Sequence, residues 1–341
     1  MGLQLAGLHH ITAITSDSET AVRFYTGLLG LRLVKKTVNF DDPTAYHLYF
    51  GDENGKPGTV LTFFDWGPGL GHGSLGLGVA QHLAFSTKDE DSLGGWKAWL
   101  EQNAVRVLGP FDRGSYKSLY FKDPDGLILE IASLGNGKGY DDSSYPESAL
   151  SAWNPGSQAV HPRASTLRIP SGLRLSGLHH VTALSRKFAP ARDFYADLLG
   201  LEVVEEPRGD RGSQHVLGLD EGAPGTMISF IDAPESRPGS VGVGTVHHVA
   251  FAVEDQTKQL EWRERLLSRG VRVTEVLDRK YFKSIYFREP NGLLLEIATV
   301  PPGFTVDEPK DRLGTRLTLP DWLEPQRQVI EASLKPLGVL A

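Results

Sequence analysis

The chain has 341 residues, which is enough for two domains of ordinary size and a substantial hydrophobic core. Hydrophobic residues make up 40% and charged residues 23%, a balance that excludes a disordered or collagen-like chain. Acidic residues outnumber basic ones, 42 against 35, without any run of Lys or Arg, so no nucleic-acid or membrane partner is expected. Because the chain has no cysteine, any metal must be held by His, Asp or Glu.

The N-terminal segment predicts no export or membrane anchoring. It lacks a basic stretch followed by a long apolar one, and no apolar run in the chain reaches the length of a membrane span. The opening Met1-Gly2 resembles the start of a myristoylation signal, but Ala6 stands where that signal needs Ser or Thr. We therefore expect a cytoplasmic protein.

Taken in chain order, the first elements read as strand, helix, strand, strand. Residues 8–14 alternate at period two, which predicts a strand. Ser16 followed by Glu19 is typical of a helix N-terminus, and Gly30 of a helix C-terminus. Two further strands are predicted over 46–50 and 59–64, and later helices over 92–102, 190–199 and 257–268.

Internal repeats divide the chain into two similar halves. GLHHITAI from Gly7 returns as GLHHVTAL from Gly177, and QHLAFST from Gln81 returns as HHVAFAV from His247. The segment 115–133, which contains Glu130, is likewise repeated as the segment 281–299, which contains Glu296. Each half splits again, which predicts four modules of βαβββ order that start near Leu8, Gln81, Leu178 and His247.

These repeats predict the domain organisation. Residues 1–134 form the first pair of modules, split near 80, and residues 173–300 form the second pair, split near 245. Residues 135–172 are rich in Gly, Ser, Pro and Asn and are expected to be a linker. The tail, 301–341, belongs to neither repeat and is expected to pack a short helix against the body through Leu317, Leu319, Leu323 and Ile330.

Charged and imidazole side chains occur inside strands that are otherwise apolar. Glu130 and Glu296 each stand in such a strand, 48 residues after His82 and His248 respectively. His10 and His180 occupy the matching place in the other two modules, as the third residue of each set. Two imidazoles and one carboxylate on adjacent strands form the facial triad that suits non-haem Fe(II) and leaves coordination positions open.

The alternative is that these are hydrogen-bonded core histidines beside a salt-bridged carboxylate. The repetition of the pattern in both halves favours metal ligation. The neighbouring His9, His179 and His247 are expected to face the opposite way along their strands and to support the ligands or pack. The remaining histidines lack a repeated acidic partner and are expected on the surface or in loops: His47, His72, His161 and His215.

A glycine-rich segment over 71–76 matches the pattern GxGxxG of dinucleotide-binding proteins. A strand rather than a helix follows it, so the nucleotide interpretation fails. The segment is expected to be a loop between modules, with its counterpart at 238–242.

Four βαβββ modules with His on a first strand and Glu on a last strand resemble the vicinal oxygen chelate superfamily, which includes glyoxalase I and extradiol dioxygenases. More narrowly, the chain resembles the hydroquinone 1,2-dioxygenase family of ring-cleaving dioxygenases, through segments such as LHHIT, LVKKTV, YHLYFGDE and GFTVD. The resemblance implies an α+β fold in which the modules pair into two cupped, barrel-like mixed sheets.

The resemblance also implies a site and an activity. The metal ligands are expected to be His10, His248 and Glu296, with Tyr286, Arg279 and His247 as catalytic residues. The implied cofactor is Fe(II), with Mn(II) or another divalent metal as alternatives. The implied partners are a small aromatic diol and O2, and a homo-oligomer is left open.

Two other functions are weighed against this one. A glyoxalase-like isomerase needs a fourth protein ligand, but Thr62 and Ser229 stand at the matching positions. A metal-free binding or resistance protein of the same fold usually loses the His and Glu residues, which this chain keeps.

Module pairing is not determined by the residues alone. Neighbouring modules could pair, or the first could pair with the fourth and the second with the third. The resemblance favours the second arrangement, which leaves His82, His180 and Glu130 as a second triad. We expect that triad to be less complete, with Gly114 at the place of Arg279.

Overall fold

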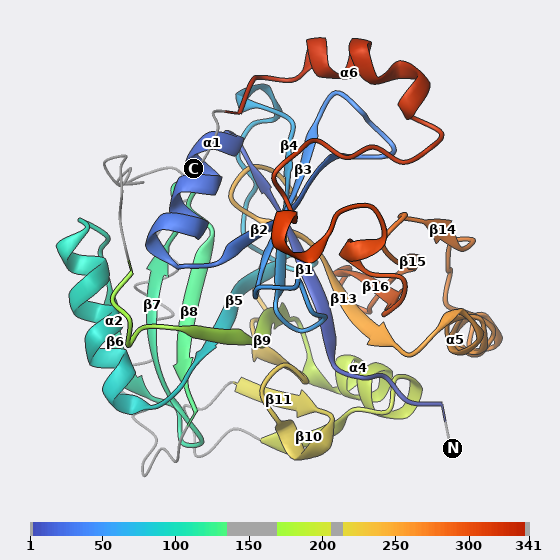
Figure 1. The fold of residues 1–341 in the computed structure, drawn as a ribbon. Coiled ribbons are helices and arrows are strands. Elements are labelled where there is room, and N and C mark those ends of the chain that lie inside the picture. Colours follow the sequence, from blue (N-terminus) through green and yellow to red (C-terminus); the bar gives the residue numbers. More distant parts are fainter. Residues whose placement is uncertain (1–2, 135–168, 206–213, 338–341) are drawn as a thin grey trace.

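The first half of the chain contains two βαβββ modules (Figure 1). The computed structural model describes residues 3–134, 169–205 and 214–337. The strands of the first two modules are β1 (Leu8–Thr15), β2 (Arg32–Val38), β3 (Tyr46–Gly51), β4 (Val60–Asp65), β5 (Ala80–Thr87), β6 (Leu108–Asp112), β7 (Lys117–Lys122) and β8 (Ile128–Ser133). Their helices are α1 (Ser18–Val22), which continues as the π-helical η1 (Arg23–Leu28), η2 (Pro68–Leu70) and α2 (Glu90–Gln102).

The second half repeats this order and adds a tail. Its strands are β9 (Leu175–Ser185), β10 (Glu202–Glu205), β11 (Gln214–Gly218), β12 (Met227–Asp232), β13 (Val246–Val253), β14 (Leu277–Asp278), β15 (Lys283–Arg288) and β16 (Leu294–Thr299). Its helices are α4 (Phe188–Asp193), η4 (Phe194–Leu198), η5 (Asp220–Gly222) and α5 (Gln256–Ser268), followed in the tail by η6 (Phe304–Val306), η7 (Lys310–Arg312), η8 (Glu324–Gln326) and α6 (Arg327–Ser333).

The strands form two curled, mixed, eight-stranded sheets, which confirms the predicted α+β fold. One has the order β14-β15-β16-β13-β1-β4-β3-β2 and joins the first module to the fourth. The other has the order β10-β11-β12-β9-β5-β8-β7-β6 and joins the second to the third. The predicted pairing across the chain is therefore correct. The predicted linker lies largely outside the described residues, so the domain boundaries stay predictions.

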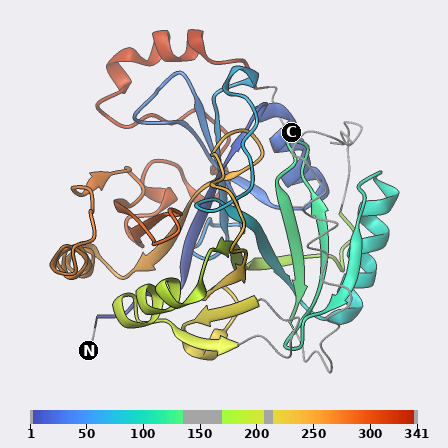
Figure 2. The ribbon, with the colours of Figure 1, turned by 180° about the vertical axis from the view of Figure 1, so that it is seen from behind.

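Each sheet has an apolar face and a face that carries polar groups. In the first sheet Ile11, Val249 and Ile297 are fully buried in the large hydrophobic core. Their neighbours His10, His248 and Glu296 are buried on the other, concave side. Helix α2 packs on β7 and β8, and α5 packs on β13, β15 and β16 (Figure 2). Apolar burial on the helix side therefore leaves the concave face for chemistry.

The helix predictions are right in place and slightly wrong at their ends. The first helix is capped by Asp17, whose carboxylate accepts from the Thr20 N–H, and not by Ser16. The Ser16 hydroxyl donates instead to Asp125 at 2.5 Å. Gly30 follows the helix with φ of 70°, as a C-terminal glycine does.

The two glycine-rich loops lie against each other, as expected of a connection between modules. The residues of 72–77 form isolated bridges with 238–243, and the Ser74 and Ser240 hydroxyls lie 2.8 Å apart. A Cβ on Gly76 would come within 2.4 Å of the Arg237 carbonyl oxygen. These glycines therefore permit two backbones to meet.

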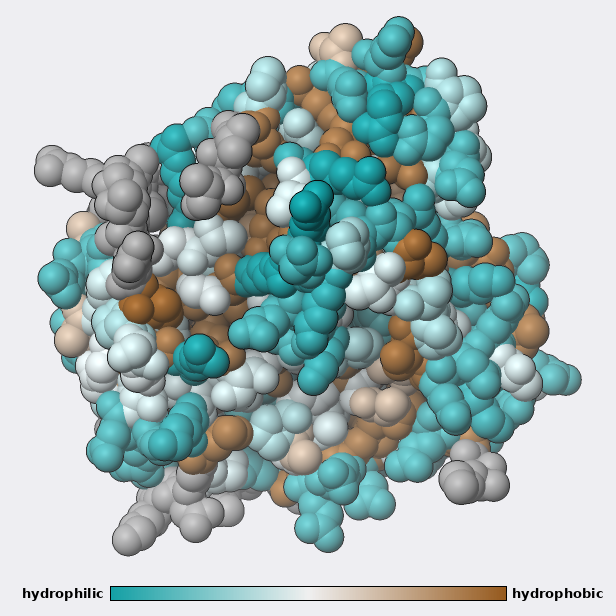
Figure 3. All heavy atoms as spheres, viewed as in Figure 1, coloured by the Kyte–Doolittle hydropathy of each residue, from teal (hydrophilic) through white to brown (hydrophobic). Residues whose placement is uncertain are grey.

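The tail packs as predicted, with Leu319 and Ile330 buried in the main core. It crosses β2, where the Thr37 hydroxyl donates to the Thr318 carbonyl at 2.6 Å. Hydrophilic side chains cover much of the face seen in Figure 3, with smaller hydrophobic areas between them. Among the described residues, no helix is long and apolar enough to cross a membrane.

Candidate metal centre

A β-bulge interrupts the first strand of every module, directly before the residue predicted as a ligand. In the first sheet, His9 is the extra residue on β1 and His247 is the extra residue on β13. In the second sheet, Gln81 and His179 occupy the same places on β5 and β9. A bulge disturbs the alternation of side chains, so two consecutive residues can point to one side.

The bulges overturn the expectation that His9, His179 and His247 face away from the ligand candidates. The Nδ1 atoms of His9 and His10 lie 2.9 Å apart, and those of His247 and His248 lie 2.8 Å apart. The His179–His180 pair repeats this contact at 2.8 Å. Each imidazole at a bulge therefore orients the next one along the chain.

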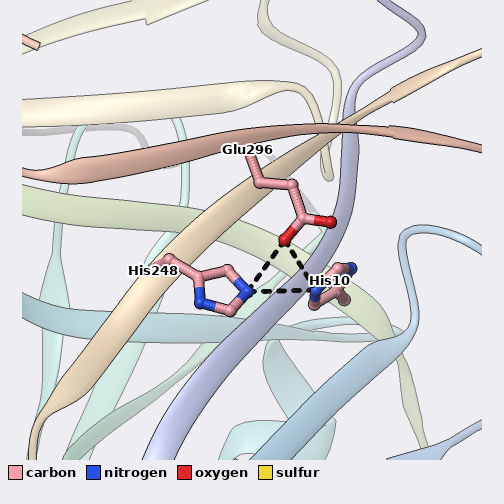
Figure 4. A group of neighbouring side chains, drawn as sticks. All are labelled: His10, His248 and Glu296. Atoms are coloured by element: carbon pink, nitrogen blue, oxygen red, sulfur yellow. Dashed lines mark hydrogen bonds and ion pairs between the residues drawn. The ribbon is translucent and has the colours of Figure 1, made fainter. Parts of the chain in front are cut away.

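The residues predicted as the first triad converge on the concave face of the first sheet (Figure 4). Nε2 of His10 and Nε2 of His248 lie 3.4 and 2.9 Å from Oε2 of Glu296, and 3.3 Å from each other. Three donor atoms about 2.1 Å from one ion, at angles of about 90–110°, are separated by about 3.0–3.4 Å. The three separations therefore match a shared divalent ion.

Protonation of these groups agrees with that arrangement. Burial alone would raise the pKa of Glu296, but His10 and His248 lower it well below its usual value, so the carboxylate is ionised. Burial and the neighbouring His10 lower the pKa of His9 to about 3, so His9 is neutral. A metal held by Nε2 of His10 would leave the imidazole proton on Nδ1, from where it would donate to Nδ1 of His9.

The predicted Tyr286 and Arg279 lie beside this triad. The Tyr286 ring meets the His248 ring edge-on at 5.6 Å, and Tyr286 pairs with Glu296 across β15 and β16. The Arg279 guanidinium lies 5.5 Å from the centre of the Tyr286 ring and forms a 2.9 Å ion pair with the exposed Asp41. Burial raises the pKa of Tyr286, with Glu296 adding to the shift, so its phenol keeps its proton.

A small cavity opens onto the two histidines of the triad. Besides the predicted residues, its lining includes Asn39, Phe40, His47, Tyr49, Phe64 and Phe282. Phe282 packs on the rings of both His9 and His10, at 5.0 and 5.1 Å. The cavity has a volume of only about 30 Å³, but its lining combines aromatic walls with a few polar groups, the chemical character that a small aromatic ligand requires.

The expectation that His47 lies on the surface or in a loop is wrong. His47 is buried on β3, with Nε2 2.9 Å from the Thr62 hydroxyl and Nδ1 2.9 Å from the Tyr49 hydroxyl. Burial, then the neighbouring His10 and His248, lowers its pKa well below the usual value, so it is neutral. The alternation of YHLYF would have placed His47 and Tyr49 on one face, together with the cavity.

The other histidines have separate places. His72 is exposed in the loop between modules, as expected, and His161 lies outside the described residues. His215 lies on β11 rather than in a loop, stacked on Phe188 at 3.7 Å and 3.1 Å from Asp232.

The second triad also assembles, on the concave face of the second sheet. Oε2 of Glu130 lies 3.0 Å from Nε2 of His82 and 3.2 Å from Nε2 of His180. The expectation that Gly114 replaces Arg279 here is wrong. Arg113 is the counterpart, since both arginines precede their tyrosines by seven residues, and its guanidinium lies 5.3 Å from the Tyr120 ring.

Comparison with known proteins places the chain in a family. The signature of the Glyoxalase/Bleomycin resistance protein/Dioxygenase superfamily matches residues 7–131 and 177–297. The chain is 37% identical to the "Putative ring-cleaving dioxygenase MhqO" of Bacillus subtilis (strain 168), over 99% of both chains. It is 31% identical to the chlorohydroquinone/hydroquinone 1,2-dioxygenase of Sphingobium indicum, over 94% of this chain and 93% of that one.

A solved structure agrees with these matches. The crystal structure of a "putative dioxygenase" from Bacillus subtilis subsp. subtilis str. 168 has a TM-score of 0.82, with 37% identity and 99% of both chains covered. The chain therefore belongs to the Glyoxalase/Bleomycin resistance protein/Dioxygenase superfamily and, within it, to the ring-cleaving dioxygenases.

Proposed function

We propose that this protein is a non-haem Fe(II) dioxygenase that opens the ring of a hydroquinone-like or catechol-like aromatic diol, with the metal held by His10, His248 and Glu296. The observation that carries the proposal is the convergence of two imidazole Nε2 atoms and one carboxylate oxygen at 2.9–3.4 Å. The relatives named as ring-cleaving dioxygenases supply the reaction class.

The donor set fits a divalent metal. Oε2 of Glu296 is buried and accepts no hydrogen bond of regular geometry from the described residues, although two imidazole nitrogens face it. Lone pairs that converge in this way repel one another unless a cation lies between them. Two neutral nitrogens and one carboxylate are also the ligand set expected for Fe(II) or Mn(II).

Among the described residues, three candidate ligands converge at this site and no fourth joins them. The Thr62 hydroxyl, at the position where a glyoxalase-like site would place a carboxylate, is engaged with Thr12 at 2.8 Å and His47 at 2.9 Å. Open coordination positions are what a diol and O2 require, so the arrangement favours a dioxygenase over an isomerase. Bound there, the metal would hold both reactants together and stabilise developing negative charge.

The surrounding residues bind and orient the diol. Tyr286 keeps its phenolic proton and can donate it in a hydrogen bond to a substrate oxygen near His248. Arg279 places a positive charge beside the same oxygen, anchored at the cavity mouth by Asp41. Phe282, Phe40 and Phe64 line the space for the ring. The reaction consumes one O2 per ring, breaks one ring carbon–carbon bond and leaves both oxygen atoms in the product.

The test is oxygen uptake by protein loaded anaerobically with Fe(II). We expect uptake with hydroquinone or catechol at one O2 per diol, and loss of both activity and first-site metal in His10→Ala and Glu296→Gln. His72→Ala is the matched control, because it removes an exposed loop histidine that belongs to neither triad, and it should behave as the parent. Full activity in either triad variant, or no uptake with any diol, would contradict the proposal.

A further inference from the structure

The second sheet carries a cluster of polar groups that the proposed function does not use. His82 on β5, His180 on β9 and Glu130 on β8 are each at most 2% exposed. In this cluster both imidazole Nε2 atoms and both Glu130 oxygens lack a hydrogen bond of regular geometry to the described residues. Glu130 faces the two imidazoles at 3.0 and 3.2 Å, among buried polar neighbours that include Arg113 and Gln81.

We infer that His82, His180 and Glu130 form a second divalent-metal site, so that the chain holds two ions. A buried carboxylate faced by two imidazole nitrogens, without a hydrogen bond of regular geometry to either, is costly unless a cation lies between the donor atoms. The buried Arg113 places a positive charge near His82, beside the Tyr120 ring. The two Glu130–imidazole separations match donor atoms that share one ion at about 2.1 Å, and all three donor atoms lie within 4.8 Å of one another.

The aromatic and Nδ1 contacts of the two clusters correspond, although Ser284 donates to Glu296 while its counterpart Ser118 makes no such bond to Glu130. The His82 ring meets Tyr120 edge-on at 5.4 Å, as His248 meets Tyr286 at 5.6 Å. Gln81 reaches Nδ1 of His82 through Oε1 at 3.2 Å, as the imidazole of His247 reaches His248.

The correspondence continues around the other imidazole. Tyr116 packs on His180 at 5.6 Å in the place that Phe282 takes beside His10, at 5.1 Å. His179 holds Nδ1 of His180 at 2.8 Å. Gln81 and His179 therefore orient their neighbours so that Nε2 of each points to Glu130, which a merely structural His–Glu contact does not require.

The second site differs from the first in its exposure. Arg113 and Tyr120 are each 2% exposed, whereas Arg279 keeps 17% of its side chain exposed and is paired with the exposed Asp41. The ion of the second site would also bridge modules two and three, because His82 and Glu130 come from one and His180 from the other. We therefore expect an enclosed ion that stabilises the second sheet.

The experiment counts metal ions per chain. The parent, the single variants Glu130→Gln and Glu296→Gln and the double variant that combines them are depleted of metal, reloaded anaerobically with Mn(II), dialysed to equilibrium and analysed for bound metal. We expect two ions in the parent, one in each single variant and none in the double variant. Titration of the depleted parent with Co(II), followed by visible absorption, should reach its end point at two equivalents and does not depend on the variants folding. His72→Ala should bind two ions.

The outcomes separate this inference from the proposed function. One ion in the parent that disappears in Glu296→Gln but stays in Glu130→Gln would overturn the second site and leave the first intact. One ion with the opposite dependence would support the second site and overturn the first. No ion in the parent would overturn both.

Discussion

At the scale of single residues, each imidazole of the two triads contacts the side chain of the residue before it. His9, His179 and His247 hold the Nδ1 atom of the following imidazole, and Gln81 does so with its amide oxygen. An acceptor at Nδ1 keeps the proton there and leaves Nε2 free to bind a metal. Either an imidazole or a carboxamide can therefore contact Nδ1 of the histidine that follows it.

That equivalence predicts the behaviour of two variants at position 247. His247→Gln should keep metal affinity at the first site within a few-fold, because Gln81 makes the same contact with His82. His247→Leu should weaken binding about 10–100-fold, because it leaves the Nδ1 proton of His248 without its acceptor. Competition with a calibrated chelator measures both affinities. Equal affinity in the two variants would show that His247 only packs.

Tyr286 allows a test of chemistry apart from metal binding. Tyr286→Phe removes the hydroxyl beside His248 while the three ligands remain, so bound metal should be unchanged and kcat should fall about 100-fold. Tyr195→Phe is the control, since the buried Tyr195 hydroxyl has no hydrogen-bond partner among the described residues and its ring lies in the hydrophobic core. If turnover in Tyr286→Phe equals that of the control variant, the tyrosine has no part in the reaction.

At the scale of elements, the tail secures the strand that lies at one edge of the first sheet. Lys35 on β2 is fully buried, with Nζ 2.6 Å from Asp307 and 2.5 Å from Glu308. Asp307 also accepts from the Tyr281 hydroxyl at 3.1 Å, next to Phe282 in the cavity wall. The tail therefore supports the site although it belongs to neither repeat.

The contrast between a buried and an exposed ion pair of the tail gives a prediction. Lys35→Met should lower the free energy of unfolding by about 3 kcal/mol, because the buried Glu308 loses its close ion pair and keeps only Arg316 at 3.9 Å and the Gly314 N–H. Lys335→Met breaks the exposed pair with Asp17 and should cost less than about 1 kcal/mol. Urea unfolding of both variants measures the difference. Similar small losses would mean that the Lys35 cluster adds no stability.

At the scale of the whole molecule, the modules of different sheets are joined through acidic turns. The Asp123 carboxylate in the second module accepts from the Tyr25 hydroxyl in the first at 2.8 Å. Its other oxygen accepts the N–H groups of Asp125 and Leu127. Burial, then the neighbouring Asp125, raises the pKa of Asp123 to about 7.

This raised pKa predicts a loss of stability with rising pH. Between its unfolded pKa of about 4 and its folded pKa near 7, Asp123 holds a proton only in the folded state, so its contribution falls as pH rises through that window. Asp123→Asn cannot ionise. The parent should therefore lose about 3 kcal/mol of unfolding free energy between pH 5 and pH 8 that the variant does not lose. Urea unfolding at both pH values checks this; parallel pH profiles for the two proteins would contradict it.

Much of the fold and of the candidate site follows from local pattern. Period-two alternation over 8–14, the duplicated His-to-Glu interval of 48 residues and the repeated turns predict the strands, the modules and the members of both triads. These features can be predicted because each depends only on neighbouring residues, which determine the side chains that one strand places on the same face.

Tertiary structure was needed wherever two distant strands meet. The residues left both pairings of the modules open, and only the contact of β1 with β13 and of β5 with β9 joins first to fourth and second to third. The bulges at His9 and His247 arise from register shifts between β1 and β13. Strict alternation would place these two side chains on the opposite face, and the bulges turn them toward the ligand candidates. Long-range strand register, which no local period encodes, therefore decides which histidines share one carboxylate and which ones orient them.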